Sequence, residues 1–256
     1  MSQKIKLAER VISASRAARV AKASRFGIMI SAILTFLIFA ISYYGEVVGN
    51  FTVAVERPAQ NAGITLYENY IDREMTSRLL VEQVEDPGGM TWYCGTEFSE
   101  FSEGNTVCMP SDEELGAEDG SNNGVSFISY TFYVENAGNA TVDLSATMSL
   151  ISQSQGADEA LRVRIIIDGI GVTYAKRQSE NGEEPGELEP LCEDFYSPTI
   201  VAYQELTYFE PGEVIKVTVA VWYEGEDADH TINLLGGGTK LDMDFEIIHV
   251  YDDDDL

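Results

Sequence analysis

The sequence predicts a mainly β protein: one N-terminal transmembrane helix followed by an antiparallel β-sandwich with loop insertions. A run without any charge extends from Phe26 to Gly45, which is long enough for a helix to cross the hydrocarbon core of a bilayer. Beyond this run, apolar and polar residues alternate in several short segments, with the two-residue period of half-buried strands. Glycine, proline and asparagine separate the segments, as is typical of sandwiches.

Charge is distributed very unequally about the uncharged run. Residues 1–25 hold seven Lys or Arg and one acid, Glu9, whereas all other acids of a chain with net charge −27 follow the run. Basic flanks stay on the cytoplasmic side. We therefore expect a basic, helical cytoplasmic tail at 1–25, a transmembrane signal-anchor at 26–45 and an acidic extracytoplasmic domain at 46–256 in the cell membrane. Its negative charge argues against nucleic acid as a partner.

A cleaved signal peptide is the alternative to a retained anchor. Ala40-Ile41-Ser42 offers small residues at the spacing that a signal peptidase reads, and the mature chain would then begin at Tyr43. The apolar part of a cleaved signal is about 7–15 residues long. The run here is longer, which favours the anchor.

The strands follow from the alternation, most clearly where Val142, Leu144, Ala146 and every second residue to Leu150 are apolar. The turn Glu135–Asn139 predicts that the strand before it and the strand after it pair as an antiparallel hairpin. One short helix is expected at Asp227–Leu235. The predicted strands are Phe51–Val55, Gly63–Glu68, Leu79–Val84, Ile128–Val134, Thr141–Leu150, Leu161–Ile167, Gly171–Ala175, Thr199–Tyr203, Val214–Tyr223 and Leu241–Ile248.

Two stretches predict loop insertions into a single sandwich domain. They are 86–123 and 178–198, which are rich in Gly, Pro and acids and have little periodicity. Cys94 and Cys108 bracket part of the first insertion, so a disulfide between them would close a loop of about 15 residues. Cys192 is then left over. Three cysteines allow three choices of pair, and three free thiols are the further alternative.

No catalytic or cofactor motif is found in the sequence. The two histidines, His230 and His249, lack the H-E-x-x-H spacing of a zinc peptidase. Calcium, which prefers oxygen ligands, has candidates in Asp227 and Asp229, although the spacing of a calcium-binding helix–loop–helix is absent. Plain surface acidity is the simpler interpretation of these acids. We expect a protein that is not an enzyme and has no cofactor, with calcium as the open alternative.

Several segments resemble the TasA/camelysin-like secreted or surface proteins of Gram-positive bacteria, mainly within residues 127–248. The most specific match is Trp222–Asp229, with the pattern W-x-E-G-x-D-x-D. The other matching segments are Gly49–Thr52, Phe132–Gly138, Ala160–Arg164, Phe209–Glu213, Leu235–Gly238 and Lys240–Phe245. The first insertion departs from the family pattern, and His230 stands where relatives often carry Cys.

The resemblance implies a jelly-roll or immunoglobulin-like sandwich outside the cell, in some relatives polymerising into biofilm-matrix filaments by donating an N-terminal strand. The corresponding strand here is Phe51–Val55. We expect a non-enzymatic, membrane-anchored surface protein for envelope or matrix assembly, whose partners are the membrane, other surface proteins or copies of itself. A camelysin-like metal-dependent peptidase and a calcium-dependent adhesin are the alternatives.

Overall fold

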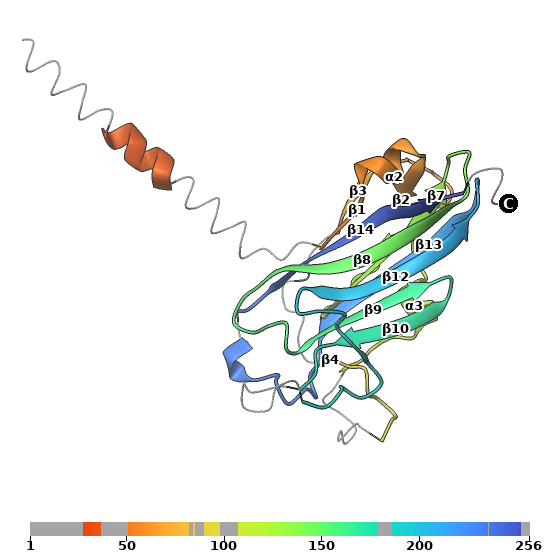
Figure 1. The fold of residues 1–256 in the computed structure, drawn as a ribbon. Helices are drawn as coiled ribbons and strands as arrows, with labels where there is room; N and C mark the ends of the chain where they lie inside the picture. Colours follow the sequence, from red (N-terminus) through yellow and green to blue (C-terminus); the bar gives the residue numbers. More distant parts are fainter. Residues whose placement is uncertain are drawn as a thin grey trace, which may run out of the picture. The chain divides into compact units, whose positions relative to one another are not determined.

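A computed structural model of the chain describes residues 28–36, 51–81, 84, 90–97, 107–178, 186–234 and 236–251 (Figure 1). The chain forms two compact units, Met1–Val47 and Val48–Leu256. The first unit contains the predicted anchor and the second contains the predicted sandwich.

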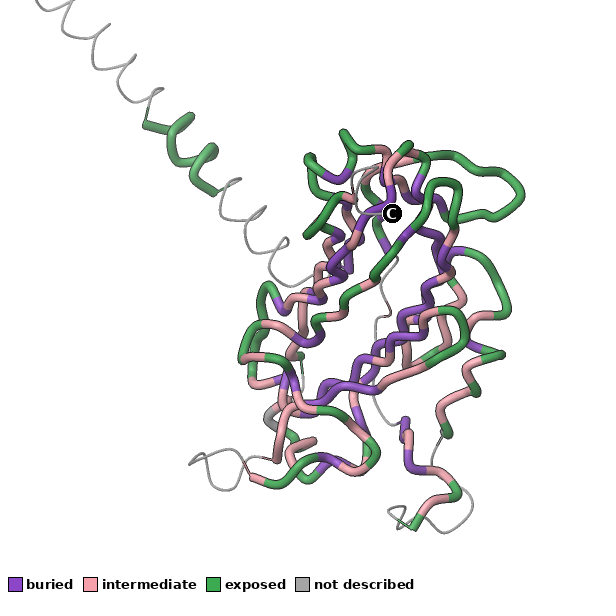
Figure 2. Tube along the Cα trace, turned by 45° about the vertical axis from the view of Figure 1, so that its right-hand side comes forward, coloured by how far each residue is buried: buried purple, intermediate pink, exposed green. Residues whose placement is uncertain are grey.

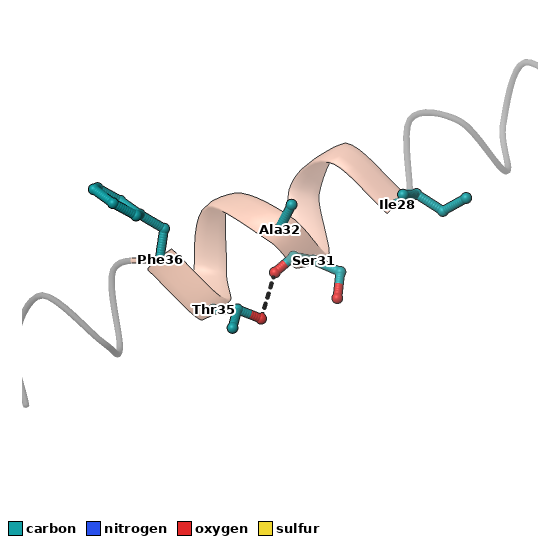
Figure 3. Close-up of a pocket in the computed structure, with 5 residues that line it drawn as sticks. All are labelled: Ile28, Ser31, Ala32, Thr35 and Phe36. Atoms are coloured by element: carbon teal, nitrogen blue, oxygen red, sulfur yellow. Dashed lines mark hydrogen bonds between the residues drawn. The ribbon is translucent and has the colours of Figure 1, made fainter.

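The described part of the first unit is a helix at 28–36 whose side chains are all exposed. In Figure 3, five of these side chains border a hollow, and Thr35 Oγ1 donates a hydrogen bond to the Ser31 carbonyl at 2.9 Å. Because one helix supplies every wall, the hollow is a gap between neighbouring side chains, and we assign it no ligand. The tail at 1–25 and the rest of the predicted span lie outside the described residues. Within the described residues, no helix is long and apolar enough to cross a membrane.

The second unit is mainly β and contains two large sheets, as the alternation predicts (Figure 1). The five-stranded sheet has the order β12 (Ile200–Phe209), β8 (Val142–Gln153), β14 (Thr239–Val250), β1 (Phe51–Val55) and β3 (Arg78–Val81). The seven-stranded sheet has the order β11 (Glu193–Asp194), β10 (Ile170–Ala175), β9 (Leu161–Ile167), β13 (Val214–Tyr223), β7 (Phe127–Asn136) and β2 (Ile64–Tyr67), with β6 (Gly120–Ser121) also paired to β7.

The main core lies between the two sheets. Buried and more exposed positions alternate along much of β8 and β14 (burial is coloured in Figure 2), because one face of each of these strands points into the sandwich. Phe132 of β7 and Phe245 of β14 meet edge to face, with 6.1 Å between ring centroids. Both rings are fully buried, as are Val163 and Val219 in the seven-stranded sheet and Leu144 in the other.

β1 is an interior strand of the five-stranded sheet. It pairs in parallel with β14, from Phe51 opposite Leu241 to Val55 opposite Phe245, and antiparallel with β3 on its other side. Most other pairs are antiparallel, whereas β10–β11 and β4–β5 are parallel. The helix α2 (Arg57–Asn61), with a proline in its first turn, connects β1 to β2.

The predicted hairpin of β7 and β8 is wrong. β7 pairs with β13 and β2, whereas β8 pairs with β12 and β14 in the other sheet. The connection therefore crosses from one sheet to the other. The buried Asn136 fixes it, because its amide Nδ2 donates to the carbonyls of Ala140 at 3.0 Å and Phe209 at 2.9 Å, while its Oδ1 accepts from the Gly138 N–H at 3.0 Å.

The predicted helix at Asp227–Leu235 is also wrong. Within its described residues the structure has turns followed by a short 3-10 helix, η1 (Ile232–Leu234). The side chain of Asp227 accepts from the Asp229 N–H at 2.7 Å, and a side chain that binds the backbone in this way favours a turn over a helix.

Described residues of the insertion at 86–123 pack on the outer face of the seven-stranded sheet. Its described residues form β4 (Met90–Thr91), β5 (Val107–Cys108), α3 (Asp112–Leu115) and β6. Met90 and Leu115 pack on Trp222, Ala220 and Ile166, which point away from the main core and form a second, smaller one. We call the described residues of this insertion the cap.

Candidate functional site

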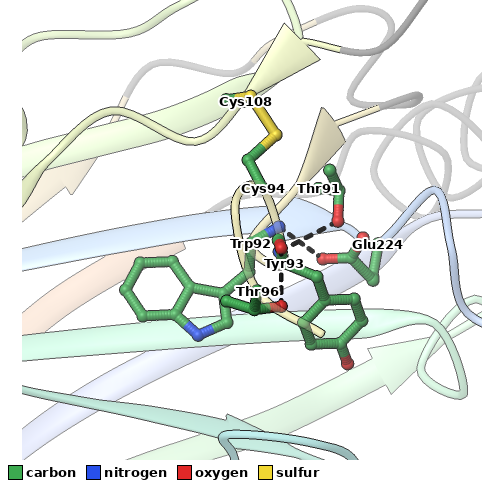
Figure 4. Close-up of a disulfide and its surroundings, with 7 residues drawn as sticks. All are labelled: Thr91, Trp92, Tyr93, Cys94, Thr96, Cys108 and Glu224. Carbon is green, nitrogen blue, oxygen red and sulfur yellow. Dashed lines mark hydrogen bonds between the residues drawn. A yellow bond between two sulfur atoms is a disulfide. The ribbon is translucent and has the colours of Figure 1, made fainter. Parts of the chain in front are cut away.

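The cap is tied to itself and to the sheet beneath it. Cys94 and Cys108 form a disulfide with a Cα–Cα distance of 5.7 Å (Figure 4). At the base of β4, the N–H of Gly225 donates to the Met90 carbonyl at 2.7 Å. Of the cysteine pairings that the sequence leaves open, the structure therefore has Cys94 with Cys108. Cys192 is a free thiol of intermediate burial.

A fully buried arginine, Arg162, lies at the centre of this end of the sandwich. It stands on the outer face of β9, and its Nη2 is 2.9 Å from Glu189 Oε2 and 2.8 Å from Asp227 Oδ2. The same nitrogen donates to the Tyr93 hydroxyl at 3.3 Å, and that hydroxyl donates to Glu189 Oε2 at 3.2 Å. One guanidinium thus joins three segments far apart in the chain: the cap, the second insertion and the turn after β13.

Glu224, also fully buried, forms the second junction. Its Oε2 accepts from the Trp92 N–H at 2.9 Å and from the Trp222 indole N–H at 3.2 Å (the former is drawn in Figure 4). Its carbonyl is 2.7 Å from His230 Nδ1. The W-x-E-G segment Trp222–Gly225 therefore fastens the cap to the turn after β13.

A second arginine two residues along β9 anchors α3. Arg164 makes two hydrogen bonds to Asp112, at 2.6 and 2.8 Å, and one to Thr173 Oγ1 at 2.9 Å. Its guanidinium carbon lies 4.3 Å from the centroid of the Trp92 ring, within cation–π range. Because residues i and i+2 of a strand share a face, Arg162 and Arg164 both point into the cap.

Burial acts against the charged forms of the acids and of the thiol at this site. Burial raises the pKa of Glu189 and of Asp227, and the positive charge of Arg162 opposes this shift. Burial likewise raises the pKa of the Cys192 thiol to about 11. A thiol with such a pKa is protonated at neutral pH and is a poor nucleophile. The arrangement is suited to holding loops in place.

The predicted calcium ligands are engaged within the protein. Asp227 pairs with Arg162 and accepts the Asp229 N–H, so the two aspartates form a turn. In the described ranges, no group of three or more His, Cys, Asp or Glu side chains could hold a metal ion. His249 packs edge-on against Tyr251, with 4.5 Å between ring centroids.

Sequence reasoning missed Arg162, Glu189 and Tyr93 as partners. Arg162 and Arg164 enter the sequence analysis only through the family resemblance. A signal was present, because two arginines on the same face of an otherwise apolar strand indicate that something covers that face. Which acids meet them depends on long-range folding and is not encoded in local spacing.

Comparison with known proteins supplies no family for this chain. No family model matches it, and no curated protein matches it. One solved structure, described as "AvmM Catalyzes Macrocyclization in Alchivemycin A Biosynthesis", is 11% identical and covers 47% of this chain and 79% of its own, with a TM-score of 0.21. A likeness of this size supports no conclusion about fold or activity.

Proposed function

We propose that the protein is a non-enzymatic, membrane-anchored surface protein whose acidic β-sandwich makes protein contacts in envelope or matrix assembly. The observation that carries this proposal is the loop end built around Arg162. Ion pairs of Arg162 fix the second insertion and the turn after β13 there on a rigid sandwich, and a hydrogen bond to Tyr93 fixes the cap, which also contains a disulfide. Loops held in this way are a common means of presenting a binding surface.

The exposed residues at this end suit recognition of another protein. Leu188 and Leu191 of the second insertion are about half exposed, at 48% and 56%, although the same segment places Glu189 in the buried ion pair. Exposed leucines on a loop that is held by a buried ion pair offer apolar contact area at a small cost in ordering. The charge asymmetry about residues 26–45 supports the membrane part of the proposal.

The place of β1 bears on how copies would assemble. Strand donation would require β1 to leave both β14 and β3. We therefore favour assembly through the loop end, with β1 kept in its own sheet. The resemblance to TasA/camelysin-like proteins stays a prediction in this proposal, and no observation favours the peptidase or the calcium-dependent adhesin.

Site-specific photo-crosslinking of the full chain in intact cells tests the proposal. A photoreactive residue at Leu191 should capture a protein partner or a second copy. The matched control is Ile170, the first residue of β10, which is 76% exposed. It lies opposite Ile167 at the far end of β9 and should capture little. Equal capture at both positions, or none at either, would contradict the proposal. Two measurements check anchoring and orientation. The captured products should stay in the membrane when it is extracted with carbonate, and protease added to the outside of the cells should cleave them.

A further inference from the structure

A lysine and two acids meet at the open end of the β9–β10 hairpin and take no part in the ion pairs of Arg162. Lys176, directly after β10, makes an ion pair with Asp158, three residues before β9 begins, and its Nζ is also 3.2 Å from Glu159 Oε1. The paired strands β9 and β10 bring these ends of the chain together, because Ala175 is opposite Arg162 in their register. The amine, the carboxyl and a second carboxyl are therefore within reach of one another.

The Asp158 carboxyl is enclosed by the protein and incompletely hydrogen-bonded. Its side chain is 5% exposed, and its neighbours Ala157 and Ala160 are buried. The second oxygen, Oδ1, is buried and has no hydrogen-bond partner among the described residues. A buried carboxylate with an unsatisfied oxygen is costly, and replacing a buried ion pair by a neutral group is often stabilising.

We propose that Lys176 and Asp158 condense into an intramolecular amide, an isopeptide bond, with Glu159 as the group that moves the proton. Holding the two reacting groups in contact gives effective molarities on the order of 10⁵ M or more in well-oriented systems. In aqueous solution, the condensation of an amine with a carboxylic acid to an amide and water is unfavourable. The high effective molarity offsets this. The product carries no charge at the buried carboxyl.

The reaction balances without an oxidant or a second substrate. Burial acts against the charge of Lys176, but the hydrogen bonds and negative charges of Asp158 and Glu159 together outweigh it and raise the lysine pKa, so the ammonium must first lose a proton. Glu159 accepts that proton, Lys176 Nζ attacks Asp158 Cγ, and one Cγ–Oδ bond breaks. The second amine proton and the proton held by Glu159 leave with that oxygen as water. An ammonium and a carboxylate thus become one amide and one water.

The bond would staple the hairpin of β9 and β10 at its open end. β9 carries both Arg162 and Arg164, so the staple would hold the strand on which the cap is anchored. It would also remain when the disulfide is reduced, because an amide does not respond to thiols.

Peptide mass spectrometry of the purified full chain tests the proposal. Cleavage after glutamate gives peptides 136–159 and 160–180, which separate only if no bond joins them. We expect one branched species, lighter than the sum of the two peptides by one water. Recovery of both peptides unmodified would overturn the proposal. A water loss confined to 136–159 would also overturn it, since that result indicates a succinimide at Asp158.

Three variants assign the roles. Lys176→Arg keeps the positive charge but provides no amine, and it should yield two separate peptides. Glu159→Gln keeps both reacting groups but removes the cleavage site after residue 159, so this variant is cut after arginine, which gives peptides 79–162 and 165–177. Most of the chain should then yield these two peptides unjoined, whereas full joining would remove Glu159 from the mechanism. Lys216→Arg is the control, because the Lys216 ammonium donates to the Gly116 carbonyl and makes no ion pair among the described residues. Peptides 136–159 and 160–180 of this variant should stay joined. Circular dichroism verifies that each variant is folded.

Discussion

At the scale of single residues, Arg162 has the largest consequences. One buried guanidinium neutralises charge on two buried carboxylates and accommodates a tyrosine hydroxyl. Removing one partner of a buried ion pair leaves an uncompensated charge, which costs about 3–5 kcal/mol. The stability of this end of the sandwich therefore depends on a residue that makes no exposed contact.

Arg162→Met should lower the free energy of unfolding by about 3–5 kcal/mol, because Glu189 and Asp227 stay buried without a counter-charge. Urea unfolding measures the loss. Arg164→Met is the matched control: its partner Asp112 is 28% exposed, so water can replace the arginine and the loss should be smaller. Adding Glu189→Gln and Asp227→Asn to Arg162→Met should restore part of the stability. Equal losses for the two arginine variants would contradict this account.

Asp244, on the outer face of β14, provides a test of pH dependence. Burial raises its pKa, as do the negative charges of Asp242 and Glu56, while Arg78 acts in the opposite direction. A pKa raised by folding stabilises the fold below the ordinary carboxyl pKa of about 4, and this stabilisation is lost as the pH rises through the folded-state pKa.

Asp244→Asn removes the loss of stability that ionisation of Asp244 causes. The variant should match the parent at strongly acid pH and become more stable than it as the pH rises above about 4. Thermal melting over a pH series measures the difference. Glu246→Gln, an exposed change on the same strand, is the control. A constant difference between Asp244→Asn and the parent at all pH values would rule out this cause.

At the scale of elements, the sequence predicts where the strands lie better than it predicts which strands pair with each other. The alternation in β8 and β14 marks which side chains are buried, and the structure buries Leu144, Met148 and Phe245 accordingly. Alternation does not tell which strand lies beside which, because two amphipathic strands can share a sheet or face each other across a core. β7 and β8 do the latter, which is why the predicted hairpin is wrong.

The cap is the element whose stability depends most on a covalent bond. Cys94→Ser with Cys108→Ser should reduce its stability by about 3 kcal/mol, since the bridge closes a short loop. We expect proteases to cut within 86–123 while the sandwich stays intact, with a change in the fluorescence of Trp92 and Trp222, which pack in the small core. Cys192→Ser is the control. Global unfolding of the double variant in one step with the sandwich would contradict an independently opening cap.

At the scale of the whole molecule, the candidate site could not be predicted because it is assembled from distant segments. Tyr93, Arg162, Glu189 and Asp227 come from four parts of the chain, and only the closed sandwich brings them together. The sequence does identify both insertions that contribute to it. The position of β1 is a further global property, because the partner β14 lies at the other end of the domain sequence.

Phe51→Ala tests whether β1 belongs to the fold of a single chain. Phe51 is 2% exposed in the main core and is opposite Leu241 and Val81, so truncation should lower the free energy of unfolding of the monomer by about 3–5 kcal/mol. Ala54→Ser, a less buried position on the same strand, should change it little. Unchanged stability of the Phe51→Ala monomer would mean that β1 contributes little within one chain and is free for donation to another. We expect a clear loss in the free energy of unfolding. If crosslinking at Leu191 also persists at a temperature where the variant is folded, assembly uses the loop end and not strand exchange.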